Sequence, residues 1–184
     1  MRKPVAKTQP LDPGEEKRPV ALNLDKNVTY LKSVFERCSD IIVREFEAGT
    51  NPPVKAAIAY VDGLVNKEML TNDLLKSFMY QASQLNAGST MTDASAFARK
   101  AVPFTEVKGM ETMDKAIPPV LSGETILLVD GINKGFALST QDWIQRGITE
   151  PETESVVRGP REGFTEGLQT NFTLIRRRLK TPKL

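Results

Sequence analysis

The stretch that decides the fold is Glu124-Thr125-Ile126-Leu127-Leu128-Val129-Asp130-Gly131-Ile132-Asn133-Lys134-Gly135-Phe136-Ala137-Leu138-Ser139. Its first part is a short, strongly apolar run, which is typical of a buried strand. Asp-Gly then indicates a turn, and residues 134–139 return as a second strand. The sequence therefore predicts a β-hairpin inside a packed sheet.

Strand and helix patterns alternate on the N-terminal side of this hairpin. We expect strands over residues 41–46, 54–61 and 104–108 because these runs are β-branched, aromatic or continuously apolar. Apolar residues at helical spacing predict a helix beginning near Asn27 and another around Met69 to Met79. A third helix should follow Gly109 and end near Pro118-Pro119.

This alternation predicts an α/β domain, with α+β left open, in which helices flank a small mixed sheet. Downstream, Phe164, Leu168, Phe172, Ile175 and Leu179 recur at helical spacing and predict a long final helix. We expect three parts. Residues 1–24 form a flexible proline-rich and charged tail, residues 25–140 form the α/β subdomain, and residues 141–184 form a polar linker and a C-terminal helix that packs on the subdomain or leaves it.

Composition excludes several function classes. The chain has 184 residues, a net charge of +2, one cysteine and no histidine. An intrachain disulfide and a Cys/His zinc site are therefore out of reach, and the commonest general base is missing. The small net charge argues against a nucleic-acid partner. No run is long and apolar enough to predict a membrane span, so we expect a soluble intracellular polypeptide that needs no cofactor and no metal.

Arg158-Gly159-Pro160-Arg161-Glu162 is the densest candidate site. Arginines and glycines before a helix are able to hold a phosphate or carboxylate. Glutamates around them outnumber the arginines, so we favour a loop of ion pairs that fixes the final helix. The alternative is a ligand or interface site.

Two aspartates form the second candidate. Asp62 and Asp130 each follow an apolar strand and precede a glycine. If the strands are neighbours, the two carboxylates could share a cation or a polar ligand, as in a metal-dependent small-molecule enzyme. Two independent turns explain the pattern equally simply, and we favour that interpretation.

Two further features suggest surfaces. Trp143 follows the hairpin and is expected either to anchor a partner or to plug the end of the sheet. Arg176, Arg177, Arg178 and Lys180 form a basic cluster that could face anionic lipid or an acidic surface of the same assembly. Cys38 lies on the apolar face of the first helix and should be a core residue.

The stretch Val156-Val157-Arg158-Gly159-Pro160-Arg161-Glu162-Gly163-Phe164, followed by Asn-x-x-Leu-Ile-Arg-Arg-Arg-Leu over residues 171–179, closely resembles the A subunit of GerA-family spore germinant receptors. Ser39 to Phe46, Ala59 to Leu64 and Gly123 to Gly131 also resemble that family. The resemblance covers nearly the whole chain beyond the tail. Family members continue past the position of Pro182, so we expect this chain to be a fragment that ends before a second subdomain.

The resemblance implies a non-enzymatic receptor domain with no catalytic residues. The family's A subunit has a soluble N-terminal region followed by membrane helices. It resides in the spore inner membrane with a permease-like B subunit and a C lipoprotein, and its soluble region faces the cytoplasmic side. The complex senses small nutrients and triggers ion release. The implied roles are subunit assembly, signal transmission and small-ligand sensing, with homo-oligomerisation open.

Overall fold

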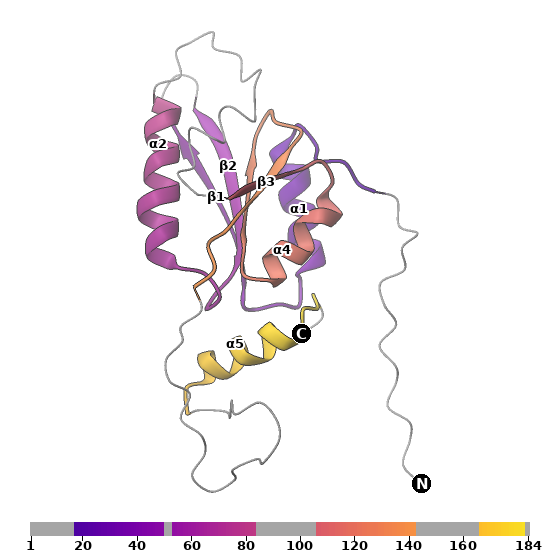
Figure 1. Ribbon diagram of the computed structural model, residues 1–184. Helices are drawn as coiled ribbons and strands as arrows, with labels where there is room; N and C mark the ends of the chain where they lie inside the picture. Colours follow the sequence, from indigo (N-terminus) through magenta and orange to yellow (C-terminus); the bar gives the residue numbers. More distant parts are fainter. Residues whose placement is uncertain (1–16, 50–52, 84–105, 143–165, 183–184) are drawn as a thin grey trace, which may run out of the picture.

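The computed structural model describes residues 17–49, 53–83, 106–142 and 166–182. Its centre is a five-stranded sheet in the order β1-β2-β4-β5-β3. Helices cover both faces of this sheet, and a final helix lies at one end of it (Figure 1). In chain order the elements are α1 (Leu24–Val34), β1 (Ile41–Ala48), β2 (Val54–Val61), η1 (Met69–Leu75), α2 (Lys76–Ser83), β3 (Val107–Met110), η2 (Met113–Ala116), α4 (Ile117–Leu121), β4 (Thr125–Val129), β5 (Gly135–Leu138) and α5 (Leu168–Arg178).

The layered α/β-type domain, the hairpin and the final helix are confirmed. The sheet differs from the expectation in one respect, because every described strand pair is antiparallel rather than mixed. The physical reason lies in the order of the strands. β3 and β4 run parallel to each other on either side of β5, and β1 and β4 run parallel on either side of β2, so an antiparallel strand always separates the parallel ones.

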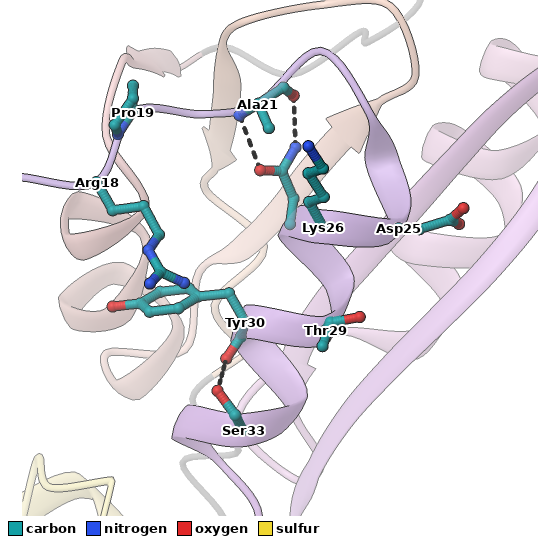
Figure 2. Close-up of a pocket in the computed structure, with 9 residues that line it drawn as sticks. Arg18, Pro19, Ala21, Asp25, Lys26, Thr29, Tyr30 and Ser33 are labelled. Atoms are coloured by element: carbon teal, nitrogen blue, oxygen red, sulfur yellow. Dashed lines mark hydrogen bonds between the residues drawn. The ribbon is translucent and has the colours of Figure 1, made fainter.

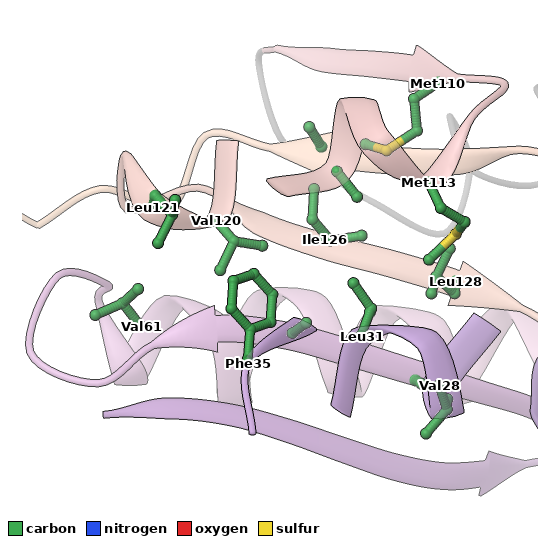
Figure 3. Packing of buried hydrophobic residues seen from close by; sticks show 14 of the residues in the cluster. Val28, Leu31, Phe35, Val61, Met110, Met113, Val120, Leu121, Ile126 and Leu128 are labelled. Carbon is green, nitrogen blue, oxygen red and sulfur yellow. The ribbon is translucent and has the colours of Figure 1, made fainter. Parts of the chain in front are cut away.

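Two cores hold the layers together. On one face of the sheet, Leu31 and Phe35 from α1 and the turn after it pack with Val120 of α4 against Ile126 of β4 (Figure 3). On the other face, Phe78 of α2 packs with Leu127 and other strand residues. β4 is buried along its whole length, because alternate side chains enter opposite cores. This explains why its sequence is continuously apolar.

The first helix begins three residues before the predicted position, at Leu24. Asn23 is the N-cap, and its side chain accepts a hydrogen bond from the Lys26 amide. Asn27 is instead buried and bonds to the backbone of Ala21, donating to its carbonyl at 2.7 Å and accepting from its amide at 2.9 Å. Together with buried Val20, these bonds pack the described end of the predicted tail against the domain.

The prolines near residue 118 start a helix instead of ending one. The predicted helix is a 3₁₀ turn, η2, followed by α4, in which Pro118 and Pro119 occupy the first turn. A proline fits there because the first helical amides have no intrahelical partner to lose. The third predicted strand is confirmed only in part, since β3 runs from Val107 to Met110 and the first two predicted positions, 104 and 105, lie outside the described residues.

Candidate functional site at the junction with the final helix

The final helix lies against the end of the sheet where β1 begins and β2 ends. Asp40 precedes β1 and Asp62 follows β2, and the Asp62 amide donates to the Asp40 carbonyl at 2.7 Å. Gln169 of α5 reaches this turn and donates from Nε2 to the Asp62 carbonyl at 3.5 Å. We call this contact between α5 and residues 38–40 and 62–63 the helix junction (Figure 1).

A buried ion pair is the strongest contact of the helix junction. Arg176 Nε donates to Asp40 Oδ2 at 2.7 Å, and Nη2 donates to Oδ1 at 2.6 Å. The Arg176 side chain is 1% exposed and the Asp40 side chain 16%. A two-pronged arginine–carboxylate pair of this kind fixes orientation as well as distance. The pair therefore holds α5 in one place on the sheet end.

The charge state of Arg176 is set by two opposing effects. Burial alone would lower its pKa, because it disfavours the charged form. The hydrogen bonds and negative charge of Asp40 outweigh burial, so the pKa of Arg176 is raised above its ordinary value. The guanidinium consequently stays charged, and the junction depends on Asp40 to balance it.

The chain after α5 turns back toward the domain. Arg176 Nη1 donates to the Thr181 carbonyl at 2.5 Å, and the Cys38 thiol donates to the Pro182 carbonyl at 3.0 Å. Cys38 is buried, as the sequence predicted, but it lies in the loop after α1 and not on the helix. Its thiol also touches the segment that follows α5, so one side chain belongs to both the core and the helix junction.

Gly63 lets α5 approach the turn closely. Its φ is +88°, a backbone conformation that favours glycine. A Cβ at this position would lie 2.6 Å from Thr173 Oγ1 of α5. The Asp62-Gly63 pair is therefore a turn, as we favoured, and it is also a contact surface for the final helix.

The alternative of an Asp62–Asp130 metal or catalytic site is wrong. The Asp130 amide donates to the Lys55 carbonyl, so Asp130 lies beside the start of β2, while Asp62 follows its end. Seven residues of strand separate the two positions, roughly 23 Å at about 3.3 Å per residue. Asp130 Oδ1 accepts from the Leu24 amide and Asp62 pairs with Lys67 at 2.7 Å. Each aspartate serves a local structural role.

The other predicted site residues have different outcomes. Arg158, Gly159, Pro160, Arg161, Glu162 and Trp143 lie outside the described residues. Arg176 was predicted to belong to a lipid or partner surface, and that is wrong because it is buried in the ion pair. Arg178 and Lys180 are exposed and Arg177 is half-buried, so they remain surface candidates.

A cavity adjoins the helix junction. It has a volume of about 520 Å³ and is lined by Asp62, Gly63, Val65, Asn66, Lys67, Glu68, Asp142 and Gln169. The hydrogen bond and charge of Asp62 raise the pKa of Lys67. Among the described residues, no group of three or more Asp, Glu or Cys side chains is placed to hold a metal ion.

A second cavity of similar size lies beside α1, away from the junction. Figure 2 shows its floor, where Arg18 lies over the ring of Tyr30 with 4.7 Å between the guanidinium carbon and the ring centroid. Arg18 and Tyr30 both bond to Asp114, through the Arg18 amide and the Tyr30 hydroxyl. This cavity is thus built by the segment that leads into α1 together with α1 itself.

Comparison with known proteins identifies the family. Residues 29–184 match the family described as Bacillus/Clostridium GerA spore germination protein. This chain belongs to the GerA family. The GerA chain is 34% identical over 172 residues to spore germination protein KA of Bacillus subtilis (strain 168), covering 92% of this chain and 31% of the relative. It is 32% identical to the uncharacterized membrane protein YfkQ of the same organism, covering 91% of this chain and 31% of that relative.

A solved structure agrees with this assignment. The N-terminal domain of the A subunit of the Bacillus megaterium spore germinant receptor GerK3 superposes with a TM-score of 0.68 at 26% identity, covering 91% of the GerA chain and 59% of that chain. The GerA chain spans about a third of the length of the curated relatives, and it corresponds to part of the N-terminal domain of a germinant receptor A subunit. Membership of this receptor family confirms the prediction that the chain is not an enzyme.

Within the described part, no helix is long and apolar enough to cross a membrane.

Proposed function

We propose that this GerA domain assembles with the other receptor subunits and transmits the germinant signal through α5. The observation that carries the proposal is the buried Asp40–Arg176 pair, which ties α5 to the sheet end as one rigid body. A partner that binds the sheet and shifts it would then move α5 as well, because the pair fixes both the position and the angle of the helix. In this proposal the domain faces the spore core, beside the permease-like B subunit and the C lipoprotein.

The proposal is tested by binding of the purified B subunit to the immobilised chain. We expect saturable binding by the native chain and weaker binding by Asp40→Ala, in which α5 is released. Glu45→Ala is the matched control, because it removes an acidic partner at a similar distance in an exposed ion pair, Lys32–Glu45 at 2.8 Å. Equal binding by all three chains would show that α5 docking has no part in assembly.

Small-ligand sensing is a second function, and the cavity beside the helix junction favours it. Its volume of about 520 Å³ suits a nutrient-sized molecule. Gln169 of α5 and the Asp62–Lys67 pair both line it, so a ligand there would contact the helix and the sheet together. A ligand carrying both charges could replace the exposed Asp62–Lys67 pair, since such pairs contribute little on their own.

Calorimetric titration with amino acids, sugars and nucleosides tests the sensing function. We expect heat of binding from a zwitterionic member of the panel, and its loss in Lys67→Gln. Lys26→Gln, in the second cavity, is the control and should leave that heat unchanged. If no member of the panel binds, or if both variants reduce binding alike, this cavity is not a sensing site.

A further inference from the structure

One side of α5 carries apolar side chains that the domain leaves exposed. Leu168 is 70% exposed, Phe172 44% and Leu179 52%. They recur at spacings of four and seven residues, with half-buried Ile175 between the last two, so Leu168 and Phe172 lie along one stripe of the helix and Leu179, the C-cap residue, follows at its end. We call Leu168, Phe172 and Leu179 the apolar stripe. Exposed apolar side chains gathered in this way indicate an interaction surface.

The helix junction fixes the direction of this stripe. Gln169, Thr173 and Arg176 contact the sheet end. In the sequence they directly follow Leu168, Phe172 and the half-buried Ile175. One residue is a rotation of about 100° around a helix. The stripe therefore lies beside the docked side of α5 and does not share it. A partner could cover the stripe while the Asp40–Arg176 pair stays intact.

The surroundings of the stripe are strongly basic. From Leu168 to Leu184 the sequence has five basic and no acidic residues, whereas the rest of the chain has more acidic than basic ones. Arg178 and Lys180 are exposed beside Leu179. An amphipathic helix with leucine and phenylalanine on one side and arginine and lysine next to them is the pattern of a helix that lies on an anionic bilayer.

We propose that the apolar stripe of α5 rests on an anionic lipid surface, with Arg178 and Lys180 contacting the headgroups. The stripe supplies apolar burial, and each basic residue near an anionic surface adds attraction. The identity of one relative agrees, because YfkQ, 32% identical over 91% of this chain, is a membrane protein. The proposal goes beyond subunit assembly and does not depend on it.

Sedimentation with lipid vesicles tests the proposal on the full 184-residue chain. The test compares neutral phosphatidylcholine vesicles with vesicles that also contain anionic phosphatidylglycerol. The native chain should bind the anionic vesicles, and Leu168→Gln/Phe172→Gln/Leu179→Gln should reduce the partition constant at least tenfold. Arg178→Gln/Lys180→Gln should reduce it roughly thirtyfold, since two charges each contribute about 1 kcal/mol. The control Met79→Gln/Tyr80→Gln removes exposed apolar residues from α2 and should change it less than about twofold.

A salt titration keeps the test independent of the folding of any variant. Raising the salt from about 0.1 M to 0.5 M shortens the range of electrostatic attraction, so binding of the native chain should weaken severalfold. The proposal is overturned if the native chain does not bind anionic vesicles, or binds both vesicle types equally. It is also overturned if the native chain self-associates, the stripe variant does not, and both bind vesicles alike, because the stripe is then a contact between copies of this chain.

Discussion

Asp40 and Arg176 are 136 residues apart in the sequence, yet they form a two-pronged ion pair with N–O distances of 2.6 and 2.7 Å. Asp40 closes the loop between α1 and β1, and Arg176 lies in the last turn of α5. The pair therefore connects the first and last parts of the described fold. Because Arg176 is 1% exposed, loss of its partner would leave a buried charge unpaired, which does not happen in an exposed pair.

Removing one partner of this pair should be costly. We expect Asp40→Ala to lower the free energy of unfolding by about 3 to 5 kcal/mol, because α5 must then either keep the Arg176 charge buried without a counter-ion or leave the sheet end and lose its packing. Glu45→Ala, which breaks the exposed Lys32–Glu45 pair, should cost less than about 1 kcal/mol. Urea denaturation of both variants measures the difference, and equal losses would show that the buried pair contributes no more than a surface one.

Gly63 offers a second way to disturb the same contact. Gly63→Ala should destabilise the domain more than Gly131→Ala, although both positions have positive φ values, +88° and +78°. Both substitutions strain the backbone by about 1 kcal/mol or more, but only the Cβ at residue 63 meets Thr173 of α5. The comparison is made by thermal unfolding, and a Gly131 variant that loses as much stability as the Gly63 variant would contradict close docking of α5.

Asn27 fastens the segment before α1. Asn27→Ala should destabilise the domain by about 1 to 3 kcal/mol, because it leaves the Ala21 amide and carbonyl without their partner. Asn23→Ala removes only an exposed N-cap bond and should cost about 1 kcal/mol. Hydrogen exchange of the Ala21 amide reports the change directly. Unchanged protection in Asn27→Ala would mean that other contacts hold this segment.

Several elements were predictable from local pattern. β2 has the predicted bounds, residues 54–61, because a run of small and apolar residues between Pro53 and Asp62-Gly63 leaves little choice. The predicted hairpin strands also match β4 and β5 closely, since Asp130-Gly131 is a typical turn sequence and marks the end of the first strand. The bounds of these strands depend on residues that are close in the sequence, and a sequence pattern contains that information.

The errors arose where contacts with a neighbouring segment decided between two local alternatives. Asn23 and Asn27 are equally good caps by type, and the bonds of Asn27 to Ala21 settle which one serves. Pro118 and Pro119 are compatible with the start or the end of a helix, and the preceding 3₁₀ turn selects the start.

The helix junction was the part least accessible to sequence reasoning. Arg176 stands in a run of three arginines, and arginine is almost always exposed unless it is paired. Its partner Asp40 directly precedes the predicted strand over residues 41–46 and was in no candidate site. No periodicity links two residues so far apart, and only the folded sheet brings them together.

The accessibility of Cys38 tests α5 docking most directly. It is the only cysteine in the chain, it is buried, and its thiol donates to the Pro182 carbonyl beyond α5. Labelling with a thiol reagent under native conditions therefore reports whether α5 and the segment after it stay on the sheet end. We predict slow labelling of the native chain, at least tenfold faster labelling of Asp40→Ala, and a native rate in Glu45→Ala. The same rate in all three chains would contradict the claim that the Asp40–Arg176 pair holds α5 in place.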